Sequence, residues 1–231
     1  MASTARIREA NEAIKEADPS LNKNARQMLL AQAMVESQFG DSHKTPTGAS
    51  SYNWGNIYAK GDLGTIPVGD SQDGVPFTAN AAWNSSDEVG ARQLVKLIRD
   101  SYGALGEASA GNLHGYAKAL FRDNKRPYYG GFPPGNPNSL APKGTPMHSE
   151  LDHYWRVMAY KRYVERGAKQ VAAALGESFT MNTSEPSPPL SASSFPWSFF
   201  GVTGVTVLLA TSLYGWQAGW FDKMVHGRLR S

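Results

Sequence analysis

The chain has 231 residues, a formal net charge of +3 and no cysteine. Its length suits one domain with an appendage, and its charge is too mild to indicate nucleic-acid binding, which concentrates Lys and Arg in stripes. The lack of cysteine excludes disulfides and thiolate metal sites, and because the five histidines lack metal-ligand spacing, we expect no metal and no cofactor.

The N-terminal segment predicts an amphipathic helix. Apolar residues recur at helical spacing from Ile7 to Ala17, Ser3 or Thr4 can cap the start, and Asp18-Pro19 ends the helix. Charged residues interrupt the apolar ones throughout, so this segment does not have the pattern of a signal peptide.

A second helix is predicted from about Asn22 to Phe39, closed by Gly40. Steps of three and four residues place four of its side chains on one face: Leu29, Gln32, Ala33 and Glu36. Leu29 and Ala33 should make this face the buried one, and a carboxyl that loses hydration there has a raised pKa. Glu36 could then hold a proton at neutral pH and donate it to a glycosidic oxygen. The structural alternative is a Glu that points into solvent at a helix end.

The middle of the chain predicts a small β-lobe followed by helices. Residues 41–84 are rich in Gly, Pro, Ser, Asn and Asp, with short β-prone pieces at Tyr52–Ala59, Thr65–Val68 and Val75–Thr78. Helices are expected after a capping box at Ser85–Glu88, over about Asn112–Arg122, and from His148 or Ser149 to about Leu175. A loop of a kind that is commonly functional, Arg126–Met147, precedes the last helix. The predicted fold class is therefore α+β, mainly α.

The last of these helices is basic. It carries Arg156, Lys161, Arg162, Arg166 and Lys169. We interpret this charge as a solvated face, with contact to an anionic wall or lipid surface as the alternative.

The C-terminal part predicts a linker and a membrane span. Residues 181–197 are Ser- and Pro-rich, and no charged residue or His occurs from Pro186 to Phe221. As a helix, Phe199–Trp220 would be about 33 Å long, enough to cross a bilayer core of about 30 Å. A buried core helix is the alternative. The expected organisation is a domain at 1–180, a linker at 181–197, a transmembrane helix at 198–221 and a basic tail at 222–231.

Four segments, taken in order, resemble the lysozyme-like glucosaminidases of glycoside hydrolase family 73, a group that includes the flagellar muramidase domain. The segments are LLAQAMVESQFG, SYNWGNIYA, FTANAAWNSSDEVGARQLVKLI and GYAKALFRDNKRPYY, within about Ala25–Tyr129. The resemblance implies a lysozyme-like fold, a peptidoglycan glycan strand as partner, and Glu36 as the catalytic acid at the end of an Ala-rich helix.

The resemblance also implies a second acid in the β-lobe hairpin. Glycosidases usually need one, because the oxocarbenium-like transition state and the attacking water require a negative charge or a base. Asp70 takes this place in DSQDGVP, where the family generally has Glu, and Asp73 is the fallback. A turn-capping role is the structural alternative for both.

Further residues are implied in sugar binding. Trp54 would offer a flat apolar face, and the amides of Asn53 and Asn56 would bond hydroxyl and acetamido groups. A buried Trp flanked by Asn turns is the structural alternative. Tyr128 or Tyr129 matches the family's cleft Tyr, and the sequence leaves the choice open.

The predicted function is cleavage of β-1,4 bonds in peptidoglycan, of the endo-glucosaminidase or muramidase type. The alternatives are a lytic transglycosylase, in which Glu36 acts alone, and a non-catalytic protein that binds the wall or perforates a membrane. Basic residues follow the expected span: Lys223, Arg228 and Arg230. The positive-inside rule would place them in the cytoplasm and the enzyme outside, which without a signal peptide favours packaging in the virion of a membrane-containing phage. A bacterial cell-envelope enzyme is the alternative.

Overall fold

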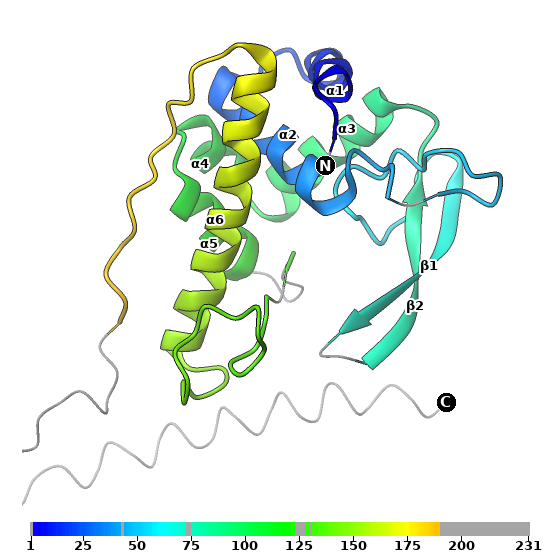
Figure 1. Ribbon diagram of the computed structural model, residues 1–231. Helices are drawn as coiled ribbons and strands as arrows, with labels where there is room; N and C mark the ends of the chain where they lie inside the picture. Colours follow the sequence, from blue (N-terminus) through cyan, green and yellow to red (C-terminus); the bar gives the residue numbers. More distant parts are fainter. Residues whose placement is uncertain (1, 43, 73–74, 123–127, 130, 190–231) are drawn as a thin grey trace, which may run out of the picture. The chain divides into compact units, whose positions relative to one another are not determined.

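A computed structural model describes residues 2–42, 44–72, 75–122, 128–129 and 131–189. This part of the chain is mainly helical with one β-hairpin (Figure 1), which confirms the α+β class. The elements are α1 (Thr4–Ala17), α2 (Lys23–Ser37), β1 (Gly64–Gln72), β2 (Val75–Trp83), α3 (Asp87–Lys96), a π-helical turn (Leu97–Ser101), α4 (Leu105–Ser109), α5 (Leu113–Arg122) and α6 (Glu150–Leu175).

The chain divides into two compact units, Met1–Pro189 and Leu190–Ser231. The predicted transmembrane helix at 198–221 and the basic tail lie in the second unit, outside the described residues. Within the first unit, the structure describes no helix that is both long and apolar enough to cross a membrane.

The helices α1 and α6 begin at a predicted cap, α2 begins after Asn22, where its start was predicted, and α3 shows one shift. Ser3, Asn22 and Ser149 each accept a backbone N–H of the first turn of α1, α2 and α6. In α3 the cap is Ser86 and not Ser85. Ser85 instead bonds the Asp62 carboxylate through its backbone N–H at 2.9 Å and through its hydroxyl, so a contact distant in sequence decides which serine caps the helix.

The predicted end of α2 was wrong by two residues. The helix stops at Ser37, and Gln38 and Phe39 both have left-handed φ angles, of 51° and 61°. Such angles are unfavourable for residues other than glycine. Here the fully buried Phe39 ring packs edge-on against Trp54 at 5.2 Å, and this packing offsets the strain. Glu36 is therefore the penultimate residue of α2.

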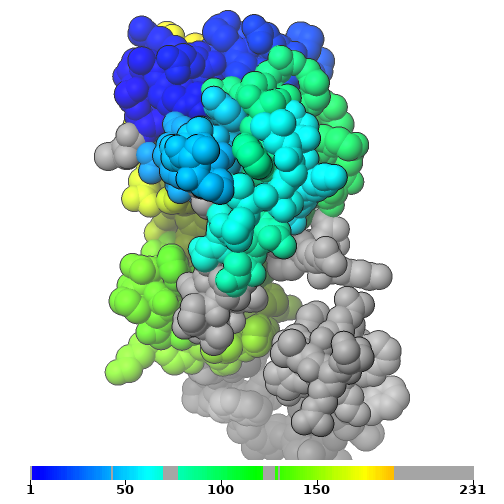
Figure 2. Space-filling view, turned by 90° about the vertical axis from the view of Figure 1, so that its right-hand side faces the viewer, coloured from blue at the N-terminus to red at the C-terminus, as the bar shows by residue number. Residues whose placement is uncertain are grey.

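The β-lobe consists of one antiparallel hairpin, which projects from the helical body (Figure 1). Its register runs from Gly64 opposite Trp83 to Gln72 opposite Val75. Figure 2 shows the face on which α1 (dark blue) lies above the hairpin and its adjoining loops (cyan). The β-prone segment Tyr52–Ala59 forms a compact loop and no strand.

Close packing of α2 on α6 places one face of α6 beside the end of α2. A Cβ atom at Gly167 of α6 would lie only 3.1 Å from Val35 Cγ1 and 3.2 Å from Ala31 Cβ. A side chain at position 167 would therefore require Val35 or Ala31 to move by a few tenths of an ångström at this close crossing.

After α6 the chain turns at Gly176 and runs back along that helix in extended form (Figure 1, yellow to orange). Lys161 Nζ donates to the Thr183 carbonyl at 2.5 Å, and Tyr154 Oη donates to the Pro186 carbonyl at 2.8 Å. The described part of the predicted linker, 181–189, therefore contacts α6.

Candidate active site

Glu36 lines a pocket of about 990 Å³. One side is formed by the loop before α6, through Tyr129, Gly131, Phe132, Asn138 and Leu140, and the other by α6. The α6 residues on the pocket are Arg156, Ala159, Tyr160, Arg162, Tyr163, Glu165 and Arg166, and Glu185 closes one edge. The carboxyl thus opens onto a space that is lined by aromatic and charged side chains.

The Glu36 carboxyl is suited to hold a proton near neutral pH. Burial raises its pKa from 4.5 to about 7, and the nearby Tyr160 hydroxyl opposes part of this rise. The face of α2 below it is apolar as predicted, with Leu29 and Ala33 fully buried. The structural alternative, a Glu pointing freely into solvent, does not describe this partly buried side chain.

Four tyrosines lie within electrostatic reach of Glu36, and its charge raises the pKa of each phenol in addition to the effect of burial: Tyr116, Tyr128, Tyr160 and Tyr163. Tyr116 donates to Gln32 Oε1, Tyr128 to the Gly55 carbonyl, and Tyr163 to the Val35 carbonyl at 2.6 Å. The buried Tyr160 hydroxyl makes no such bond in the described part of the protein.

Tyr160 is therefore the phenol that is available to the acid. Its ring stacks on Tyr129 with centroids 3.8 Å apart and an interplanar angle of 10°, which fixes its orientation. Tyr129 itself lines the pocket, and its hydroxyl donates to the Ala117 carbonyl at 3.0 Å. Of the two tyrosines that the sequence left open, Tyr129 presents a surface to the pocket, and Tyr128 lies near Glu36.

Asn53 and Trp54 lie where the structural alternative placed them. Both side chains are fully buried. Asn53 closes a loop by accepting the Ile57 N–H at 2.7 Å and donating to the Ile57 carbonyl at 3.1 Å, while Trp54 Nε1 donates to Asp87 at 2.8 Å. In this conformation neither side chain can contact a glycan. Asn56 is partly buried with φ of 50°, and its Oδ1 has no hydrogen-bond partner in the described residues.

For Asp70, the predicted second acid, the structure describes the position of the backbone only. Asp70 lies in β1, opposite Phe77 of β2. Asp73 falls between the strands, outside the described residues. Asp70 therefore stays a prediction.

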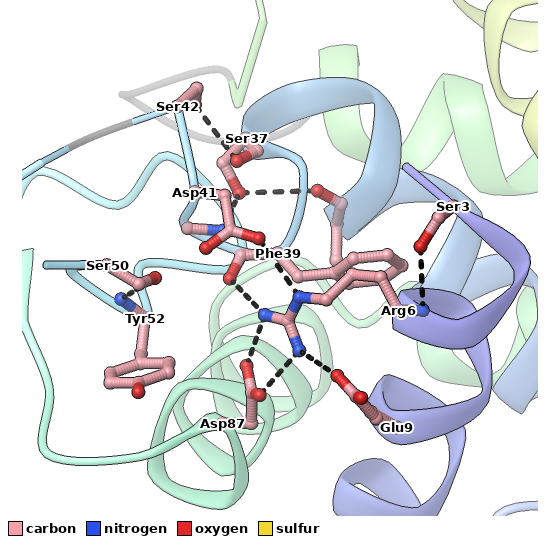
Figure 3. Close-up of polar contacts among 12 residues, drawn as sticks. Ser3, Arg6, Glu9, Ser37, Phe39, Asp41, Ser42, Ser50, Tyr52 and Asp87 are labelled. Carbon is pink, nitrogen blue, oxygen red and sulfur yellow. Dashed lines mark hydrogen bonds and ion pairs between the residues drawn. The ribbon is translucent and has the colours of Figure 1, made fainter. Parts of the chain in front are cut away.

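A cluster of polar contacts around Arg6 supports the turn that follows Glu36 (Figure 3). The Arg6 guanidinium of α1 donates to both Asp87 oxygens at 2.6 and 2.8 Å, to Asp41 at 3.0 Å and to the Phe39 carbonyl at 3.1 Å. It also lies over the Phe39 ring, 5.3 Å from the centroid. Arg6 thus ties α1 and α3 to the left-handed turn at the end of α2, and the sequence analysis did not identify this role.

No family model and no curated protein matches this chain. Among solved structures, it is similar to the catalytic domain of the autolysin Auto from Listeria monocytogenes. The TM-score is 0.40 and the sequence identity is 17%, over 55% of this chain and 80% of that one.

Proposed function

We propose that this chain cleaves β-1,4 bonds of peptidoglycan glycan strands, with Glu36 as the acid in a lysozyme-like domain. The observation that carries the proposal is a carboxyl with a pKa of about 7 that lines a pocket of about 990 Å³. Near pH 7 about half of the Glu36 side chains hold a proton, which is the condition for general-acid catalysis at that pH. The resemblance of the surrounding sequence to family 73 glucosaminidases supports a glycan as substrate.

In the first step, Glu36 gives its proton to the glycosidic oxygen as the bond to the anomeric carbon breaks. The Tyr160 hydroxyl can then donate to the carboxylate that forms. The ring of Phe132 and the exposed part of Tyr129 offer apolar surfaces on which a sugar can pack. These residues bind and orient the strand while Glu36 supplies the proton.

A lytic transglycosylase is the second candidate, and one observation favours it. Among the carboxylates that line the described pocket, Glu165 and Glu185 are engaged in ion pairs with lysines and an arginine of α6. This leaves Glu36 as the described pocket carboxylate without a cationic partner. Glu36 would act first as acid and then as base. As base it would take the proton of a muramyl hydroxyl, which attacks the anomeric carbon of the same unit and forms the anhydro ring. Asp70 assisting a water would instead give hydrolysis.

Mass spectrometry of digested murein tests both candidates. A reducing GlcNAc end indicates a glucosaminidase, a reducing MurNAc end a muramidase, and an anhydro-muramic end a transglycosylase. Glu36→Gln should release none of these products. If it digests murein as fast as the wild type, the catalytic proposal is wrong, and a non-catalytic wall-binding or membrane-perforating protein takes its place.

We further propose that residues 198–221 anchor the domain in a membrane, in a phage virion or in the bacterial envelope. The support is the uncharged stretch in the sequence. Protease accessibility of the N-terminal domain in intact particles and in spheroplasts distinguishes the two locations.

A further inference from the structure

One face of α6 forms a wall of the Glu36 pocket and carries a positive charge at each end. Its residues follow helical spacing: Arg156, Ala159, Tyr160, Tyr163 and Arg166. At 1.5 Å rise per residue, the two arginines are about 15 Å apart along the helix axis. Between them lie the tyrosines that adjoin Glu36 and the small side chain of Ala159. A ligand lying along this wall would meet apolar surface in the middle and a cation at either end.

The cations of this wall differ in their partners. Arg156 Nε donates to the buried Asp152 carboxylate at 2.9 Å, and Arg162 bonds both oxygens of Glu185 at 3.0 Å. Arg166 is exposed, and no carboxylate of the described residues pairs with it. Arg166 is thus the pocket cation whose charge the protein leaves uncompensated in the part that the structure describes.

Arg166 lines the same pocket as Glu36 and lies near a tyrosine that bonds the end of α2. Burial and the charge of Glu36 raise the pKa of the Tyr163 hydroxyl, and the charge of Arg166 opposes them. The same hydroxyl donates to the carbonyl of Val35, the residue that precedes Glu36. Tyr163 therefore links Arg166 to the end of α2, and because Arg166 and Glu36 line one pocket, a group held by Arg166 would belong to the strand that occupies the Glu36 pocket.

We propose that Arg166 binds a carboxylate carried by the muramic acid unit beside the scissile bond. This inference rests on the proposed function. In murein, GlcNAc is uncharged, whereas each muramic acid bears either a free lactyl carboxylate or a peptide with carboxylates of its own. A guanidinium matches a carboxylate in geometry and can bond both of its oxygens. The site would thus select murein over an uncharged β-1,4 glycan such as chitin.

Binding of three soluble probes to the full chain tests the inference, in a Glu36→Gln background that prevents cleavage. The probes are a murein tetrasaccharide with its peptides, the same tetrasaccharide without peptides, and chitotetraose, which has no carboxylate. Arg166→Gln should weaken murein binding about 3- to 10-fold, as expected for the loss of one charge-assisted contact, and should leave chitotetraose binding unchanged. Added salt should reduce the difference between the two proteins.

Arg92→Gln is the matched control, because Arg92 is an exposed arginine of α3 that pairs with Glu88 and does not line this pocket. It should bind all probes as the parent does. A loss with the peptide-free probe alone assigns the free lactyl carboxylate, and a loss with the peptide-bearing probe alone assigns a carboxylate of the peptide. A loss with both murein probes means that Arg166 accepts either carboxylate. Equal losses on murein and chitotetraose, or no loss at all, would overturn the inference. If the wild type cleaves no murein while the carboxylate-dependent loss persists, the glycosidase proposal fails and the binding site stands.

Discussion

Replacing Glu36 by Gln should abolish catalysis and, at high pH, stabilise the fold. In the folded chain the pKa of Glu36 is about 7, against 4.5 for an ordinary Glu. Because the folded pKa is the higher one, folding carries no ionisation cost below pH 4.5, and the stability that the neutral form provides is lost as the pH rises through 7. At about 1.4 kcal/mol per unit, the full cost is about 3 kcal/mol. Gln never ionises, so the variant should avoid it.

Urea unfolding of the wild type and the variant at pH 4 and pH 8 measures this effect. The two proteins should differ little at pH 4, whereas at pH 8 the variant should gain up to about 3 kcal/mol, or roughly 6 to 12 °C in Tm. Glu16→Gln makes the same chemical change on an exposed residue of α1 and should not reproduce the pH dependence. If the gap between wild type and Glu36→Gln is the same at both pH values, Glu36 is not held neutral by its surroundings, and the reasoning fails.

Three further predictions concern the residues around the acid. Tyr160→Phe removes a hydroxyl that favours the Glu36 carboxylate, so the basic limb of the kcat/KM profile should move above pH 7; a limb that stays in place would contradict this role. Arg6→Ala leaves Asp87 without its cation and should cost about 2 to 3 kcal/mol in urea unfolding, whereas a neutral result would show that the cluster in Figure 3 contributes little. Gly167→Val should overpack the α2–α6 crossing, with a loss of about 1 to 3 kcal/mol and a lower kcat; unchanged values in both assays would refute the close packing.

Local signals predicted the helix starts well, because a cap is a contact between residues three apart. The end of α2 depends on contacts that are distant in sequence. Phe39 takes a left-handed φ since its ring packs on Trp54 and its carbonyl binds Arg6, which lies 33 residues earlier. A rule that places Gly40 just past the helix therefore missed the boundary.

The conformation of the segment around Trp54 could not be predicted for a related reason. Its β-prone residues and its asparagines fit a strand, a sugar site or a buried loop equally well. Asn53 bonds both backbone groups of Ile57, which closes the loop and turns Trp54 into the core. The three interpretations differ only in which groups the asparagine side-chain amides bond, and the residue types alone do not reveal this.

In the candidate site, too, local spacing predicted some features, and others depend on contacts between residues that are distant in sequence. The burial of Glu36 follows from the spacing of Leu29 and Ala33 on its own helix, and the sequence predicted it. Tyr160 and Tyr163 arrive on α6, more than 120 residues later in the chain. Their spacing of three residues indicates one helical face, but only the packing of α6 on α2 determines that this face meets the acid.

The position of Glu36 at the end of α2 bears on the second step of the reaction. The last turn of a helix carries partial negative charge, and the Gln38 N–H that caps α2 is already bonded to carbonyls of that turn. Burial raises the pKa of Glu36, and the charge of the helix end acts in the same direction. In the proposed reaction, Glu36 would after donating its proton be a stronger base than an exposed Glu, able to take a proton from an incoming hydroxyl. The proposed transglycosylation requires this second role, because the muramyl hydroxyl must lose its proton to the same carboxylate, whereas in the proposed hydrolysis Asp70 can assist the water instead.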